Sequence, residues 1–459
     1  MNRLNIFVQT VDGRDVKRIT SETGRSISYY FWANNNQLLY VKEKNGGTTP
    51  RLYVVDKEGK QRRDLIPYQD VKFDLIRTEP LHNNELLIAL NKRDVAAFDA
   101  YRLNVETGKL TLVSQNPGNI ISWHADPQGK IRLAVAGDGV NESILYRESE
   151  NEEFKVVVTN NFKSTLSPIG FGKDQTCIYA VSNNNRDKSA LVEFDCKTGK
   201  EHKVIYSHPQ VDVSSAAYST TKEKLVYVEY ETWKRERHFL DDEMRKIFRF
   251  LERELPRSEI RISSTDSAEN KFIIRTFTDR TPGAYYLYTH PDQKLVKLSS
   301  VNPSLQEENM AEMKPIAYKT RDNLTINGYL TLPKGAEAKN LPVVVLPHGG
   351  PSARNSWGFN AEVQFLANRG YAVFQMNYRG SKGYGKNFWT AGFKQWGGKI
   401  QNDITDGVKW LIREGIADSA RIGIYGSGFG GYSALHGLCF NADLYACGAS
   451  YAGMVNLFT

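Results

Sequence analysis

The stretch Ile424-Tyr425-Gly426-Ser427-Gly428-Phe429-Gly430-Gly431-Tyr432 joins an apolar segment to a segment with helical character. Residues 421–425, which lead into it, have the length and composition of a buried strand. The glycines allow the chain to turn sharply, and residues 430–440 can continue as a helix. The stretch therefore predicts a strand, a tight turn and a helix in immediate succession.

The same alternation continues on the N-terminal and C-terminal sides of this stretch. We expect a hairpin over 313–330, strands over 343–346, 372–376, 421–425 and 446–452, and helices over 361–369, 403–414 and 430–440. Strands that are apolar on both faces and alternate with helices indicate a doubly wound, mostly parallel sheet. After Asn302-Pro303 the repeated short strands give way to this alternation of strands and helices, so we place the domain at residues 310–459.

The glycine turn matches the nucleophile elbow of an α/β-hydrolase. Such an elbow needs small residues two positions before and two positions after the nucleophile, because the chain is crowded there. With Gly426 and Gly430 at the small positions, the nucleophile position falls on Gly428. The residue at that position is not a serine, so we predict that the nucleophile is lost.

Ser427 is the only hydroxyl next to this position and is the alternative nucleophile. Its neighbours two positions away are Tyr425 and Phe429, whose bulk conflicts with an elbow centred on Ser427. A displaced hydroxyl also loses its alignment with a general base. We therefore predict that Ser427 is an ordinary turn serine, and that Ser433 lies inside the following helix.

A glycine-rich loop, Pro347-His348-Gly349-Gly350-Pro351, follows the first expected parallel strand. Acyl transfer needs two backbone donors for the oxyanion, one from such a loop and one from the residue after the nucleophile. We predict Gly349, Gly350 and Phe429 as the oxyanion residues. A plain turn is the alternative for the loop taken by itself.

The general base and its orienting acid normally follow the nucleophile along the chain of an α/β-hydrolase. After Gly428 the sequence holds one histidine, His436, and one carboxylate, Asp443. His436 lies on the helix that leaves the elbow, where a surface or hydrogen-bonded histidine is the simpler interpretation. We predict that the acid and the base are absent from these residues and that the hydrolase domain is represented by its N-terminal part only.

Residues 1–309 carry a different pattern, a short strand followed by a turn with Asp, Asn or Gly and a second, charged strand. Copies occur at 4–8, 52–56 and 101–105, and further copies start at 144, 191 and 285. Periods of about 40 to 50 residues with four short strands each are typical of propeller blades. One further blade is expected near 226–262, where the repeat is obscured because 241–251 has apolar residues at helical spacing.

We predict from these repeats an all-β, seven-bladed propeller whose first blade is incomplete. The helix at 241–251 is interpreted as an insertion between blade strands, either an ordinary surface helix or one that gates access to a site. The first hairpin begins at residue 4, which suggests that the chain starts late within its first blade.

Composition narrows the classes of function. Hydrophobic residues make up 40% of the chain, and the net charge of +8 comes from basic residues interleaved with acids, as in 235–237. A nucleic-acid site needs charge clustered on one face, so we predict no nucleic-acid partner. No apolar run reaches the length needed to span a membrane. The four cysteines, Cys177, Cys196, Cys439 and Cys447, show no CxxC spacing, and we predict no metal and no cofactor. We expect these cysteines to be reduced, partly buried thiols.

Several stretches together carry a resemblance to a known family. They are His348-Gly349-Gly350-Pro351, 377–385 (Asn-Tyr-Arg-Gly-Ser-Lys-Gly-Tyr-Gly), Trp396-Gly397-Gly398, 403–412 and the elbow. The chain resembles the prolyl oligopeptidase family of serine peptidases, closest to its acylaminoacyl-peptidase and dipeptidyl-aminopeptidase-like branch. The family elbow reads Gly-x-Ser-x-Gly-Gly-Tyr, and its serine corresponds to Gly428.

The resemblance implies hydrolysis of short peptides, with a propeller over the hydrolase site. Because position 428 is glycine, we expect a serine peptidase by descent that is catalytically inactive, a truncated chain or pseudoenzyme. The alternatives are a non-catalytic propeller module that binds peptides or a protein, and a weak residual hydrolase that uses Ser427. The sequence shows no signal peptide and indicates a cytoplasmic protein; a late start leaves a periplasmic or secreted one open.

Overall fold

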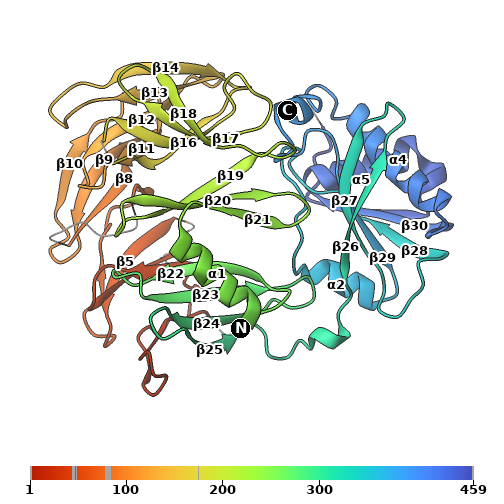
Figure 1. Cartoon of the computed structure of the whole chain (residues 1–459), viewed down its shortest axis with the longest axis horizontal. Coiled ribbons are helices and arrows are strands. Elements are labelled where there is room, and N and C mark those ends of the chain that lie inside the picture. The colour runs from red at the N-terminus through yellow and green to blue at the C-terminus, as the bar shows by residue number, and fades with distance from the viewer. Residues whose placement is uncertain (1–2, 44–46, 48, 78–83, 174, 457–459) are drawn as a thin grey trace. The chain divides into compact units, whose positions relative to one another are not determined.

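The computed structural model describes residues 3–43, 47, 49–77, 84–173 and 175–456 (Figure 1). The chain forms two compact units, residues 1–180 with 192–203 and residues 181–191 with 204–459. Among the described residues, no helix combines the length and the apolar character that crossing a membrane requires.

The first unit consists of consecutive antiparallel sheets. Its strands are β1 (Phe7–Gln9), β2 (Val16–Arg18), β3 (Tyr29–Trp32), β4 (Gln37–Glu43), β5 (Pro50–Asp56), β6 (Arg63–Asp64), β7 (Phe73–Leu75), β8 (Glu85–Asp94), β9 (Ala97–Asn104), β10 (Leu110–Ser114), β11 (Ile120–Ala125), β12 (Ile131–Gly137), β13 (Asn141–Tyr146), β14 (Lys155–Asn161) and β15 (Leu166–Phe171). The strands β16 (Cys177–Ser182), β17 (Ala190–Asp195) and β18 (Lys200–Tyr206) are divided between the two units.

Turn chemistry explains why each sheet pairs strands that are neighbours in sequence. After β5, the Asp56 carboxylate accepts from the amides of Glu58 (3.0 Å) and Lys60 (2.7 Å), and Gly59 has a φ of 78°. This conformation is open to glycine at little steric cost. The apolar side chains of Leu52 and Val54 in β5 belong to one buried core together with Leu86 and Ile88 of the next sheet.

The second unit begins with β19 (Val213–Ser219), β20 (Lys224–Glu231) and β21 (Arg235–Phe239), followed by helix α1 (Asp242–Glu254) and the sheet β22 (Glu259–Thr265), β23 (Lys271–Phe277), β24 (Ala284–Thr289) and β25 (Lys294–Ser300). The predicted helix is confirmed. It lies between the last strand of one sheet and the first strand of the next, and its residues Met244, Ile247, Phe248 and Leu251 are buried at helical spacing.

The sheets described so far identify a β-propeller. In the described part of the chain, six sheets of three or four strands each form blades, and the two-stranded sheet β1–β2 precedes them. Within each blade the hydrogen-bonded order of the strands follows, or reverses, their order in the sequence. This up-and-down arrangement is the one that propeller blades have.

A six-stranded sheet follows, with the order β26-β27-β29-β28-β30-β31. Its strands are β26 (Met313–Lys319), β27 (Thr325–Thr331), β28 (Leu341–Val345), β29 (Ala372–Asn377), β30 (Ala417–Ser427) and β31 (Cys447–Tyr451), and its helices are α2 (Ala361–Asn368), α3 (Lys386–Thr390), α4 (Lys399–Arg413) and α5 (Phe429–Phe440). The short 3₁₀ helices η1 (Glu307–Asn309) and η2 (Ala442–Leu444) precede β26 and β31. The pairs β26–β27 and β27–β29 are antiparallel and the other pairs are parallel, so the predicted mostly parallel sheet is confirmed.

Two elements of this domain start earlier than the sequence predicted. Helix α4 begins at Lys399 rather than 403, because Ile400 is fully buried in the sheet core. Strand β30 begins at Ala417 rather than 421, because Ala417 is buried and pairs with Leu341 across an irregularity in the register. Both differences reflect contacts distant in sequence, which local patterns do not contain.

The cysteines differ from the expectation of partly buried thiols. Cys177 and Cys196, in the propeller, are buried, whereas Cys439 and Cys447 are exposed. Cys447 belongs to β31, the edge strand of the six-stranded sheet, in which every residue is exposed.

Candidate active site

Gly428 is the single residue between the end of β30 and the start of α5. It has φ 57° and ψ −119°, a backbone conformation that strains residues with a side chain. Its amide donates to the carbonyl of Tyr451 at 3.1 Å, and its carbonyl accepts from the amide of Tyr432 at 3.0 Å. The chain therefore makes its sharp reversal at position 428, where the sequence placed the apex of the elbow.

The glycines on either side of the apex meet very different surroundings from Gly428. A Cβ atom on Gly426 would lie 2.4 Å from the carbonyl carbon of Gly430, and one on Gly430 would lie 2.2 Å from the carbonyl oxygen of Pro347. Only glycine fits at these two positions. A Cβ atom on Gly428 would meet nothing within 4 Å, so a side chain at the apex would project into open space.

The predicted oxyanion loop lies directly against the elbow. The loop follows β28, and a Cβ atom on Gly349 would approach the carbonyl oxygen of Ser427 to 3.3 Å. The close contact between Gly430 and Pro347 holds the start of α5 onto the start of the same loop. The structure thus brings together Gly349, Gly428 and Phe429, which the sequence selected from segments about eighty residues apart.

His348 is fixed by a cluster of side chains that sequence reasoning did not single out. Its Nε2 lies 2.8 Å from the Ser381 hydroxyl, and the Tyr378 hydroxyl donates to its carbonyl at 2.8 Å. The rings of His348 and Tyr378 stack at 4.2 Å. Burial lowers the pKa of His348 to about 4, so the imidazole is neutral at physiological pH. The motif at 377–385 was the available signal for these partners.

An ion cluster of buried Arg379, buried Asp403 and exposed Asp322 anchors the start of the same motif. The Arg379 guanidinium contacts Asp403 at 2.6 Å and Asp322 at 2.7 Å, and the Arg379 amide donates to Asp403 at 2.9 Å. Burial raises the pKa of Asp403, whereas hydrogen bonds from Arg379 and then Thr320 hold the pKa of Asp322 well below its usual range. The cluster ties β29 to α4 and fixes where the following loop begins.

Ser427 is the exposed last residue of β30 and pairs with Tyr451 of β31. Ser433 is buried inside α5 and accepts a hydrogen bond from the Gln401 amide at 3.2 Å, as its predicted position in a helix implies. Neither hydroxyl belongs to the residue at the apex.

His436 and Asp443 lie beyond the elbow. The His436 ring lies between those of Tyr432 (5.9 Å) and Phe440 (4.6 Å) on α5, and burial lowers its pKa. Asp443 belongs to η2, after the end of α5.

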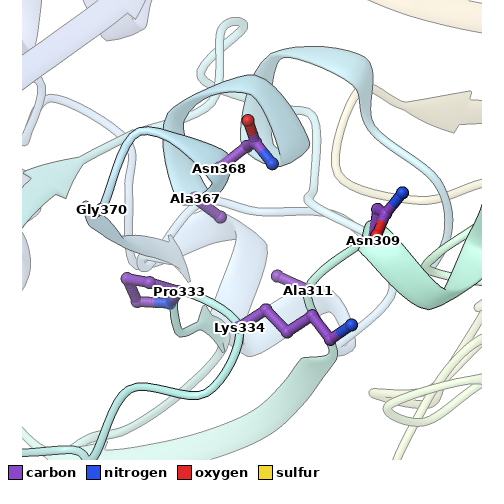
Figure 2. A pocket seen from close by; sticks show the side chains of 7 residues that line it. All are labelled: Asn309, Ala311, Pro333, Lys334, Ala367, Asn368 and Gly370. Carbon is purple, nitrogen blue, oxygen red and sulfur yellow. The ribbon is translucent and has the colours of Figure 1, made fainter.

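A pocket of about 420 Å³ lies apart from these residues (Figure 2). It is lined by Asn309, Ala311, Pro333, Lys334, Ala367, Asn368 and Gly370, none of which belongs to the elbow or to the oxyanion loop. Lys334 donates to the carbonyl of Glu308 beside it. The pocket therefore adds nothing to the acyl-transfer geometry.

Comparison with known proteins identifies the family of the chain. Residues 357–459 match the prolyl oligopeptidase family. The chain is 32% identical to the dipeptidyl aminopeptidase BIII of Pseudoxanthomonas mexicana over 470 residues, which covers 99% of this chain and 68% of that protein. The chain belongs to the prolyl oligopeptidase family.

Other members of the family span both parts of the chain. The dipeptidyl peptidase family member 6 of Caenorhabditis elegans is 26% identical over 99% of this chain, and the alignment covers 66% of that protein. The chain thus spans about two thirds of the length of these two relatives.

Solved structures support the fold. A puromycin-hydrolyzing peptidase of Mycobacterium tuberculosis superimposes on 97% of this chain and 73% of its own, with a TM-score of 0.74 at 15% identity. A puromycin hydrolase mutant in complex with PGG matches 99% of this chain and 75% of its own, with a TM-score of 0.75 at 15% identity.

Proposed function

We propose that this member of the prolyl oligopeptidase family does not hydrolyse peptides through its elbow. The observation that carries the proposal is the residue at the apex, Gly428, which has elbow geometry and open space above it but no hydroxyl. A serine-peptidase mechanism requires an oxygen there to attack the scissile carbonyl. Gly349, Gly350 and Phe429 are proposed as the remnants of the oxyanion site.

The positions of the other candidate groups support the same proposal. Ser427 is displaced by one residue from the apex, and its own neighbours at the small positions are Tyr425 and Phe429. His436 is packed between aromatic rings of α5. An acyl-transfer site that lacks its nucleophile keeps only the rate enhancement from binding and from the oxyanion donors.

Short peptides are the proposed ligands. Relatives are named as dipeptidyl peptidases and aminopeptidases, and one structural neighbour was crystallised as a mutant in complex with PGG. The supporting feature in this chain is the oxyanion loop, which lies against the elbow in spite of Gly428. Binding of peptides without cleavage is therefore the proposed role.

A serine-directed fluorophosphonate probe tests the loss of hydrolysis. We expect no labelling of the wild-type chain under conditions that label an active serine peptidase completely. Labelling that maps to Ser427 and disappears in Ser427→Ala would contradict the proposal. It would favour the second candidate function, a weak hydrolase, for which the exposure of Ser427 is the one supporting observation.

Calorimetric titration with short peptides tests the binding role. We expect heat of binding with no change in the mass of the peptide after prolonged incubation. Cleaved products would contradict the loss of hydrolysis, and absence of both binding and cleavage would contradict the peptide-binding role.

Two architectural assignments also belong to the proposal. The sheet β1–β2 is proposed to be the outer hairpin of a seventh, incomplete blade, because its two strands precede six blades of three or four strands. The boundary between a propeller at 1–309 and a hydrolase domain at 310–459 is supported by the end of β25 at Ser300 and the start of β26 at Met313.

A further inference from the structure

Two carboxylates at the end of a propeller blade contact the segment that leads into α3. Asp212 accepts from the amide of Gly385 at 3.0 Å, and its own amide donates to the carbonyl of Gly383 at 3.0 Å. Asp187 accepts from the amide of Asn387 at 2.7 Å. All of these residues belong to the second compact unit. We call Asp187 and Asp212 the acidic clamp.

The fit between the clamp and this segment is close. Gly385 has a φ of 94°, and a Cβ atom there would lie 2.5 Å from Lys188 Nζ and 2.8 Å from the Asp187 carboxylate. The Lys188 ammonium donates to the carbonyl of Tyr384 at 2.5 Å. The Asp212 carboxylate also accepts from the amide of Ser189 at 2.7 Å, so it joins the two clamp loops to each other.

Stacked aromatic rings attach the chain just before Asp212 to the neighbouring sheet. Tyr206 stacks on His238 at 4.3 Å, and His208 stacks on Tyr230 at 4.6 Å. Tyr230 and His238 belong to β20 and β21. Aromatic pairs at these separations hold a segment in place, so the loop is fixed on a sheet rather than free to follow the hydrolase segment.

The other side of the clamped segment contacts His348 of the oxyanion loop and residues just after that loop. The Tyr384 hydroxyl accepts from Arg354 at 3.1 Å and from the Asn377 amide at 2.8 Å. The Lys382 amide donates to the carbonyl of Ala353 at 3.0 Å. One step earlier along the chain, Ser381 contacts His348. The segment 381–385 is therefore bonded to the clamp on one side and to residues 348–354 on the other.

We propose that Asp187 and Asp212 are positioning residues for the oxyanion loop. They fix the backbone of 383–387, and the adjoining Ser381 and Tyr384 bond to His348 of the loop and to Arg354 just after it. The inference rests on the proposed oxyanion role of Gly349 and Gly350, but it does not depend on the residue at position 428, because none of these contacts involves Gly428. It therefore stands or falls separately from the proposed loss of hydrolysis.

Hydrogen exchange of the full chain tests the clamp. Asp212→Ala removes both carboxylate acceptors, and we expect at least tenfold faster exchange in peptides covering 383–389 and several-fold faster exchange in peptides covering 347–357. Asp212→Asn keeps one carbonyl acceptor and is expected to restore part of the protection. A purely local structural role would change only 383–389.

Asp195→Ala is the matched control. Asp195 also accepts backbone hydrogen bonds in a propeller turn, from Lys197 (2.7 Å) and Thr198 (3.2 Å), but both partners lie in its own turn. We expect this variant to leave exchange in 347–357 unchanged.

A second readout follows the imidazole itself. We expect the ¹⁵N chemical shifts of His348, which report the partners of its two ring nitrogens, to change in Asp212→Ala and to return toward wild type in Asp212→Asn. Unchanged exchange in 347–357 together with unchanged His348 shifts would overturn the proposal. So would an equal response to Asp195→Ala. If Asp212→Ala fails to fold, Asp187→Ala, which removes the side-chain acceptor for the Asn387 amide, provides the same comparison.

Discussion

The elbow and the ion cluster around Arg379 lie in the same domain, but one is defined by its backbone shape and the other by its paired charges. The elbow has kept its shape, with Gly426 and Gly430 in positions that exclude any side chain, while its apex carries no reactive group. In the ion cluster the charged groups do pair with one another, Arg379 with both Asp403 and Asp322. The backbone and ion pairs that shape this site are thus present without a nucleophilic hydroxyl at position 428.

The largest effect is expected from the ion cluster. Arg379→Ala would leave Asp403, whose side chain is fully buried, without its cation. Removing one partner of a buried pair costs about 3–5 kcal/mol, because the remaining charge is uncompensated. Urea unfolding followed by circular dichroism measures the loss. Arg421→Ala, which breaks an exposed pair with Asp418, is the control and should cost less than about 1 kcal/mol. Equal losses in the two variants would mean that the Arg379 cluster contributes nothing special.

The next effect separates two glycines of the elbow. Gly430→Ala places a methyl group 2.2 Å from a backbone oxygen, and overpacking of this kind costs about 1–3 kcal/mol or more. Gly428→Ala meets open space, so its cost is limited to backbone strain, about 1–3 kcal/mol, with no steric overlap added to it. Thermal unfolding of both variants should therefore rank Gly430→Ala as the less stable. The reverse order would show that space at the apex is not what distinguishes these positions.

The smallest effect near neutral pH is expected from two buried imidazoles. Burial lowers the pKa values of His348 and His124 to about 4, from the ordinary value of 6.5. Between pH 6.5 and pH 4 the unfolded chain binds protons that the folded chain does not, so stability falls as the pH falls. Above pH 6.5 both states are neutral and this contribution is constant.

Urea midpoints measured from pH 8 to pH 4.5 test this dependence. We expect a flatter profile below pH 6.5 in His348→Gln than in the wild type, because one of the two groups no longer titrates. Identical profiles would show that His348 has an ordinary pKa in the folded chain.

Much of the fold could be predicted from the sequence because its signals are local. Apolar runs at 343–346 and 372–376, the glycines of the elbow and the helical spacing at 241–251 each depend on a few consecutive residues. The early starts of α4 and β30 could not be predicted in this way, since they depend on the burial of Ile400 and Ala417 against partners distant in sequence.

The features of the candidate site likewise fall into those that local sequence predicts and those that tertiary contacts decide. The sequence by itself determined the elbow, the glycine-rich loop and the absence of a hydroxyl at position 428, because each is a matter of residue type and spacing. Only the tertiary structure decided that Gly430 is enclosed while Gly428 has free space, and that Ser381 holds His348. It also decided that Asp187 and Asp212 reach the segment before α3. These are contacts between segments far apart in the chain, and they exist only when the sheet and the blade have folded.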